Sequence, residues 1–144
     1  MTERNPQAAR TGLLLFRAAL LVLASPFLLS GIIKAEDFAA ATAEVRGLTG
    51  MEPAATAAFA VIAVQLGGSG LLLAGGLWTR LGALILSAFT IAATLLAHAW
   101  WAKTGFERVR DFNIFWEHMA IVAGLGIAAL AADAFQQPRP IAVR

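Results

Sequence analysis

The chain has 144 residues, of which 59% are hydrophobic and only 14% charged, and its mean hydropathy is +0.73. Soluble domains are roughly 45–50% apolar and about 25% charged, so this composition argues against an ordinary water-soluble domain. The net charge of +2 on so apolar a chain also excludes intrinsic disorder. The absence of cysteine excludes disulfides, thiolate nucleophiles and iron–sulfur clusters. The basic residues are spread thinly, unlike those of nucleic-acid-binding proteins. We therefore expect an integral membrane protein whose main partner is the lipid bilayer.

Four stretches of the sequence are long and apolar enough to span a membrane. A spanning helix needs roughly 20 mostly apolar residues to cross about 30 Å of hydrocarbon. The charged residues delimit spans at about residues 11–33, 54–77, 80–102 and 112–134. The sequence thus predicts an all-α fold, an integral membrane four-helix bundle that forms a single domain over residues 1–144. We expect the proline-containing tail, residues 136–144, to be disordered.

The connections between the spans differ in character. Residues 36–46 are rich in alanine and are followed by Gly47, which predicts a short interfacial helix between the first and second spans. Residues 75–79 leave room only for a tight hairpin. Residues 103–111 are predicted to form a short charged loop, and the tryptophans that flank it are typical of a membrane interface.

Small residues indicate where the helices pack, because glycine and alanine let helix backbones approach closely in lipid. Two such patches occur in the second and fourth spans: Gly67, Gly68, Ser69 and Gly70, and Ala120, Gly124, Ala128 and Ala132. Four spans place both termini on one side of the membrane. Basic residues are equally numerous on the two sides, and the short basic N-terminus favours cytoplasmic termini in the cell inner membrane.

The ionisable residues inside the spans are the candidate functional residues, since each costs about 2.5–3.5 kcal/mol at the bilayer centre. His98, Glu117, His118 and Lys34 lie at similar depth near one interface. A polar stripe with helical spacing runs along the third span: Ser87, Thr90, Thr94, His98 and Trp101. A second stripe in the fourth span consists of Asn113, Glu117, Ala120 and Gly124.

If these stripes face each other, His98 and Glu117 approach to roughly 3–6 Å and form a catalytic acid–base pair. His98 and His118, bordered by Trp101 and Trp116, would then contact a quinone. The alternative is that these residues are interfacial groups within reach of water or a structural polar clamp.

Two histidines also raise the hypothesis of haem b, or of a metal bound by His98, Glu117 and His118. No further signature supports either one, and we expect neither. Basic residues near the same interface would attract an anionic substrate or lipid headgroup: Lys34, Lys103, Arg108 and Arg110. Arg17 is expected to snorkel to the headgroups of the opposite interface, and Gln65 to form a structural hydrogen bond to another helix.

The ordered motifs of the chain resemble those of DoxX-like membrane proteins over about residues 13–132. They are Arg17, Ser30-Gly31 with Lys34, Gln65-Leu66-Gly67-Gly68, Thr79-Arg80, Ala93-Thr94 with His98, Trp100-Trp101, and Phe115-Trp116-Glu117-His118. The resemblance implies a four-helix membrane protein related to the small subunits of thiosulfate:quinone oxidoreductases. Many members have a glutamate at or beside Gln65 and a Lys-Asn pair at the positions of Glu117 and His118.

Two functional hypotheses follow. The first is an integral membrane subunit of a quinone-linked or electron-transfer system, with His98 and Glu117 handling protons. The second is a non-catalytic accessory subunit that docks on other membrane subunits or associates with itself. A small-solute transporter is disfavoured because no inverted repeat is evident.

Overall fold

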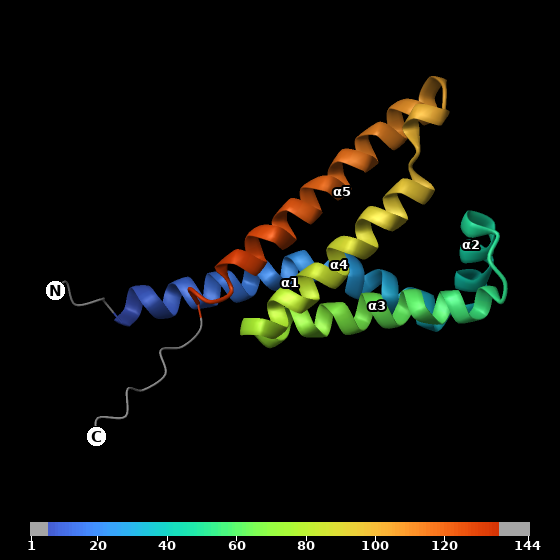
Figure 1. Ribbon diagram of the computed structural model, residues 1–144. Helices are drawn as coiled ribbons and strands as arrows, with labels where there is room; N and C mark the ends of the chain where they lie inside the picture. Colours follow the sequence, from blue (N-terminus) through green and yellow to red (C-terminus); the bar gives the residue numbers. More distant parts are fainter. Residues whose placement is uncertain (1–5, 136–144) are drawn as a thin grey trace.

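The computed structural model describes residues 6–135, and its regular elements are helices joined by short connections. Its elements are α1 (Pro6–Glu36), α2 (Phe38–Thr49), α3 (Ala54–Ala74), α4 (Gly76–Ala97), the 3₁₀ helix η1 (Trp100–Ala102) and α5 (Gly105–Ala131). Four segments are each long and apolar enough to cross a membrane: α1, α3, α4 together with η1, and α5. They run up and down in turn, so α1 begins and α5 ends at one end of the molecule, while α2 and η1 lie at the other (Figure 1). We name these the terminal end and the α2 end. The expected all-α membrane bundle with a short helix between the first two spans is confirmed.

The structure corrects two details of the predicted connections. The segment expected as a charged loop, residues 103–111, instead forms much of the first two turns of α5, which begins at Gly105. The interfacial helix α2 passes through Gly47 and ends at Gly50, whose φ of 64° lies in the left-handed region that glycine tolerates. At its start, the Asp37 carboxylate accepts a hydrogen bond from the backbone N–H of Ala40 at 2.9 Å. The tail expected to be disordered, residues 136–144, lies outside the described residues.

Helix α1 continues through Pro26 because a neighbouring hydroxyl compensates for the missing backbone donor. Proline has no N–H, so the carbonyl of Val22 loses its usual partner in the following turn. Ser25 Oγ donates to that carbonyl at 2.7 Å. The Val22 carbonyl therefore has a hydrogen-bond partner in spite of the proline.

The tight hairpin expected between the second and third spans has a single residue, Gly75, between α3 and α4. Gly75 adopts a φ of 94°, which side-chain-bearing residues rarely adopt. The fully buried Thr79 hydroxyl fastens the turn: it donates to the Leu72 carbonyl at 2.9 Å and accepts from the Gly75 N–H at 3.1 Å. Both orphan backbone groups of the hairpin are thereby paired.

Helices α3 and α4 pack with their backbones in close contact. A Cβ atom on Gly82 would lie 2.3 Å from the backbone nitrogen of Leu72 and 2.6 Å from the carbonyl oxygen of Gly68. Of the small patch expected in the second span, Gly68 and Ser69 are buried in this contact, whereas Gly67 and Gly70 are exposed. In the fourth span, Ala128 and Ala132 are buried and Ala120 is exposed.

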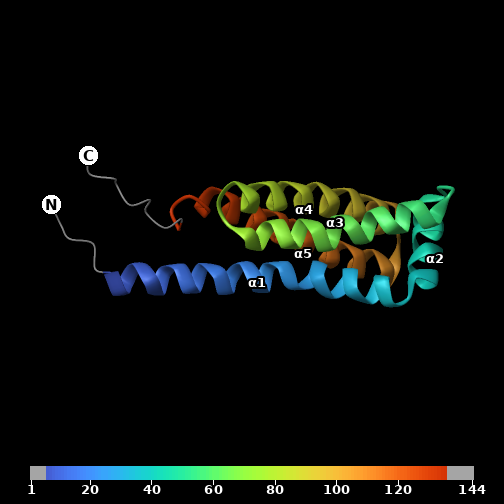
Figure 2. The ribbon, with the colours of Figure 1, turned by 90° about the horizontal axis from the view of Figure 1, so that it is seen from below.

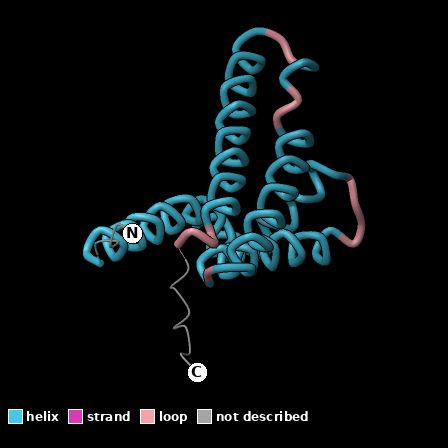
Figure 3. Tube along the Cα trace, turned by 60° about the vertical axis from the view of Figure 1, so that its left-hand side comes forward, coloured by secondary structure: helices cyan, strands magenta, loops and turns pink. Residues whose placement is uncertain are grey.

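The four spans pack tightly at the terminal end and separate toward the α2 end. Their buried apolar core lies toward the terminal end and comprises Leu20, Ala24, Phe27, Leu72, Ala83, Leu86, Leu125 and Ala128. From there the α4–α5 pair leans away from the α1–α3 pair, as Figures 1 and 3 show. Seen from below in Figure 2, α2 crosses the end of the bundle. It packs on α3 through Ala41, Val45 and Ala58. The separation leaves a cavity between the two helix pairs.

The junction between α2 and α3 is fixed by Glu52. Its carboxylate accepts a hydrogen bond from Arg46 Nε and another, at 3.0 Å, from the backbone N–H of Ala54 in the first turn of α3. The bond from Arg46, followed by that from Ala54, holds the pKa of Glu52 below its ordinary value. Glu52 therefore stays ionised and caps α3 at neutral pH.

The topology is directly testable, because the chain contains no cysteine. We expect single cysteines at Ala8 and Ala134 to react with a membrane-impermeant maleimide from the same side, and one at Gly47 from the opposite side. Gly47 suits this role because nothing lies within 4 Å of an added Cβ. Labelling in intact cells and in inverted vesicles also tests the cytoplasmic location predicted for the termini. Opposite labelling of residues 8 and 134 would contradict the four-span fold.

Candidate functional site

The candidate site is a cavity of about 490 Å³ at the α2 end, between the α1–α3 and α4–α5 pairs. This volume falls in the range of small-molecule sites, roughly 300–1,000 Å³. Its walls are mainly apolar, with Phe27, Val61, Phe89 and Ile121 among them. The polar lining residues are Ser30, Lys34, Glu44, Thr49, Gln65, Thr90, His98 and His118. An apolar cavity with a few polar groups is the usual form of a site for a hydrophobic ligand that carries a polar head.

On the α3 wall, Gln65 is buried, with 5% of its surface exposed. Its Nε2 donates to Ser30 Oγ on α1 at 3.1 Å, which is the cross-helix hydrogen bond that its depth requires. Within residues 6–135, its Oε1 has no hydrogen-bond partner. The cavity wall therefore carries an unpaired buried acceptor.

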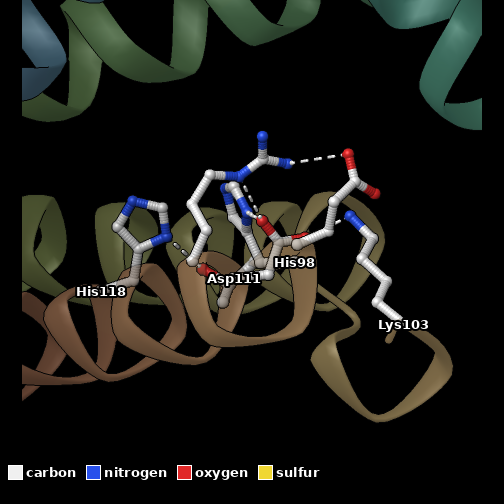
Figure 4. Close-up of polar contacts among 7 residues, drawn as sticks. His98, Lys103, Asp111 and His118 are labelled. Carbon is white, nitrogen blue, oxygen red and sulfur yellow. Dashed lines mark hydrogen bonds and ion pairs between the residues drawn. The ribbon is translucent and has the colours of Figure 1, made fainter. Parts of the chain in front are cut away.

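On the opposite wall, His118 of α5 is held by Thr94 of α4, with 2.8 Å between His118 Nδ1 and Thr94 Oγ1. The Thr94 hydroxyl has one hydrogen, and it donates to the Thr90 carbonyl at 2.6 Å. Thr94 Oγ1 can then only accept from His118, so His118 carries its proton on Nδ1. The other ring nitrogen, Nε2, points away from the α4–α5 ribbons in Figure 4.

His98 ends α4 and contacts two residues of α5. Its ring meets the His118 ring edge to face, with 5.4 Å between centroids. Its Nδ1 lies 3.6 Å from Asp111 Oδ1, which is an ion-pair distance when the imidazole is charged and too long for a hydrogen bond. The three side chains His118, His98 and Asp111 thus form a chain that runs from the cavity toward the start of α5 (Figure 4).

Asp111 is fully buried and is the centre of an ionic cluster. It pairs with Lys103 from the segment after η1 and accepts from Arg110 Nε at 3.1 Å. Arg110 in turn lies 3.9 Å from the exposed carboxylate of Glu107. From the sequence, Asp111 was interpreted only as the last residue before the fourth span. A signal was nevertheless present, because Asp111 precedes His118 by seven residues and such residues share one helix face.

The carboxylate that faces His98 is therefore Asp111 rather than Glu117. Among residues 6–135, no hydrogen bond or ion pair joins Glu117 to His98, and the Glu117 side chain is exposed. The physical reason is the rotation of α5. Its inward face carries Asp111, His118, Leu125 and Ala132, and a residue adjacent to His118 points about 100° away from it. The expected stripe through Asn113 and Glu117 instead points outward.

The tryptophans expected beside a cofactor lie in an aromatic cluster elsewhere. Trp101 and Trp116 are each more than half exposed, and both contact Phe115 edge to face. Neither lines the cavity. Their exposure at the α2 end suits the aromatic belt of a membrane interface.

The basic residues expected to attract an anion already have partners in this chain. Lys34 pairs with Glu44 of α2, and Lys103 and Arg110 pair with Asp111. The guanidinium of Arg108 lies 5.6 Å from the centre of the Trp100 ring, a cation–π distance. These contacts reduce the positive field available to a free anion. Arg17 is exposed at the other end and borders a separate hollow there, so its snorkelling stays a prediction.

The histidines do not suit haem b in this arrangement. Their rings are in direct edge-to-face contact, so no macrocycle fits between them. In the described part of the chain, no group of three or more His, Cys, Asp or Glu residues is placed to hold a metal ion. What the site offers is hydrogen bonding and proton exchange beside an apolar cavity.

The fold and this cavity define a small integral membrane protein of four spanning helices with a pocket between its helices at one end. The DoxX family model matches residues 12–99, well over half of the chain, and the chain belongs to the DoxX family. The match ends just after His98, so Asp111 and His118 of α5 lie beyond it. No curated protein and no solved structure matches the chain.

Proposed function

We propose that this DoxX-family protein is a membrane subunit of a quinone-linked electron-transfer system and that its cavity binds the quinone head group. The observation that carries the proposal is an apolar cavity of about 490 Å³, inside the spanning region, with His98 and His118 on its wall. A quinone is a lipid-soluble ring whose oxygens need hydrogen-bonding partners and exchange protons. The apolar walls match the ring and tail, and the histidines match the oxygens.

The arrangement provides a path for protons between the cavity and the α2 end. His118 Nε2 accepts a proton at the cavity, and water molecules that bridge His118, His98 and Asp111 would carry it onward, because neither the contact between the two rings nor the 3.6 Å contact of His98 with Asp111 is a hydrogen bond. Asp111 thereby takes the role that sequence analysis gave to Glu117. Its partners Lys103 and Arg110 are partly exposed and lead to water. With cytoplasmic termini in the inner membrane, this path opens on the opposite, outer face.

The electrons require another redox centre. The chain has no cysteine to hold an iron–sulfur cluster or to form a redox disulfide. We therefore propose that a partner subunit carries the electron donor or acceptor, as the resemblance to thiosulfate:quinone oxidoreductase subunits implies.

Quinone binding tests the proposal. The protein in lipid nanodiscs is titrated with a short-chain ubiquinone analogue in its oxidised and reduced forms, and bound ligand is measured by equilibrium partition. We expect saturable binding of at least one form. His118→Phe preserves an aromatic ring but removes its nitrogens, so it should weaken that binding about tenfold.

The matched control is Asn113→Leu, which also replaces a polar residue of α5 by an apolar one. Asn113 is exposed and lies outside the cavity lining, so the affinity should stay unchanged. Absence of saturable binding for both forms would overturn the quinone proposal. In that case, co-purification of a larger membrane complex would support the accessory-subunit hypothesis.

A further inference from the structure

We propose that the cavity selects the reduced quinol over the oxidised quinone, because two unpaired polar atoms of its inner walls are hydrogen-bond acceptors. This inference rests on the proposed function and adds the redox state of the ligand. The two atoms are Gln65 Oε1 on the α3 wall and His118 Nε2 on the α5 wall.

The first acceptor follows from the anchoring of Gln65. Its Nε2 is engaged by Ser30, whereas its Oε1 is buried and unpaired within residues 6–135. A buried carbonyl oxygen without a donor has lost its hydration without gaining a hydrogen bond in return. A ligand hydroxyl in the cavity would remove this penalty, and a ligand carbonyl would add to it.

The second acceptor follows from the tautomer of His118. The short chain of hydrogen bonds from His118 to Thr94 and from Thr94 to the Thr90 carbonyl places the proton on Nδ1. A neutral imidazole protonated on Nδ1 has a lone pair on Nε2. This atom accepts a hydrogen bond from a ligand and, in a further step, the proton itself.

Several donors among the lining side chains are directed elsewhere. Lys34 is paired with Glu44, and the hydroxyls of Thr49 and Thr90 donate to the Val45 and Leu86 carbonyls. Nδ1 of His98 faces the Asp111 carboxylate. A ligand that brings its own donors therefore suits the inner walls better than one that brings only acceptors.

A quinol has hydroxyl donors on both sides of its ring, whereas the corresponding quinone has carbonyl acceptors at the same positions. The quinol can donate to Gln65 Oε1 and to His118 Nε2, and the quinone would leave both atoms unpaired. The proposal concerns this binding step alone, in which no covalent bond forms or breaks. A site that prefers the reduced form is suited to taking quinol from the membrane.

The test compares both redox forms of one ligand. Nanodiscs containing the protein are titrated with decylubiquinol under anaerobic reducing conditions and with decylubiquinone in air. We expect the quinol to bind at least about tenfold more tightly. The dimethyl ether of the quinol has the same ring but no donors, and it should bind the unmodified protein as weakly as the quinone.

Two variants, one of them a control, test whether Gln65 causes the preference for the quinol. Gln65→Met keeps a similar volume without polar atoms, so it should weaken quinol binding about tenfold and leave quinone binding unchanged. The control Asn113→Leu removes a polar group of α5 that is exposed and lies outside the cavity lining, and it should leave the preference intact. The dimethyl ether comparison is independent of how well either variant folds.

The outcomes separate this inference from the proposed function. Equal affinity for quinol and quinone, or equal loss of both in Gln65→Met, would overturn the preference while leaving quinone binding established. Tight binding of the dimethyl ether would also overturn it. If neither redox form binds, the proposed function itself fails.

Discussion

Replacing Gly82 by alanine is expected to prevent the bundle from folding, because the added methyl group has no space between α3 and α4. Its Cβ would lie 2.3 Å from Leu72 N, 2.6 Å from Gly68 O and 2.8 Å from Leu72 Cα. All three are backbone atoms, and two rigid helices must separate to relieve the overlap. We expect a loss of more than about 3 kcal/mol, above the usual cost of overpacking. Yield of monodisperse protein in detergent and its melting temperature measure the effect.

Two other glycines of the spans are matched controls. Alanine at Gly67 or Gly126 meets nothing within 4 Å, and alanine also has the higher helix propensity. Both variants should therefore be as stable as the unmodified protein or slightly more so. If Gly82→Ala melts like these controls, the close backbone contact between α3 and α4 is wrong, and with it the geometry of the cavity.

The elements of the fold could be predicted from the sequence because membrane insertion imposes length and composition. Charged residues such as Arg80 and Lys103 marked the ends of the apolar segments, and Gly75 marked the hairpin. The end of α2 was predicted at Gly47, but the helix continues to Thr49 and is capped by Gly50. Only the structure shows that Gly50 adopts the left-handed conformation.

The site was predicted only in part, because its geometry depends on helix rotation. The depths of His98 and His118 placed them near each other, and their rings do touch. The partner carboxylate was missed, because an error of one residue in rotation exchanges Glu117 for His118 on the inward face of α5. Asp111 was assigned to a loop, where a charged residue needs no explanation. The cavity depends on the separation of two helix pairs, and this separation cannot be predicted from the sequence of any single helix.

The hydrogen bonds of Gln65 could also be predicted only in part from the sequence. Its position in an apolar span predicted a hydrogen bond to a neighbouring helix, and Ser30 provides one. The unpaired Oε1 could not be foreseen, because it depends on how far α4 and α5 stand from α3. The unpaired state of this atom thus comes from packing between helices.

Among changes to Asp111, His98 and His118, removing the charge of Asp111 is expected to lower the stability of the protein most. Asp111 is fully buried, and it pairs with Lys103 and Arg110 and faces His98. Asp111→Asn leaves these cations without their shared counter-ion. Removing one partner of an ion-paired cluster leaves the opposite charges uncompensated. We expect a larger loss of stability than from any exposed ion pair of α5, although Lys103 and Arg110 are partly exposed and regain water. Unfolding in a denaturing detergent measures it.

Glu107→Gln is the matched control, since Glu107 lies one helical turn earlier on α5 and also faces Arg110. Its side chain is 64% exposed and lies 3.9 Å from the guanidinium, so the pair contributes less than about 1 kcal/mol. The same comparison tests the proton path. Asp111→Asn should lower quinone-linked activity, whereas Glu107→Gln should preserve it. If the two variants have equal stability and equal activity, Asp111 is an ordinary interfacial carboxylate. The link from the cavity to the α2 end then does not depend on the buried Asp111 carboxylate.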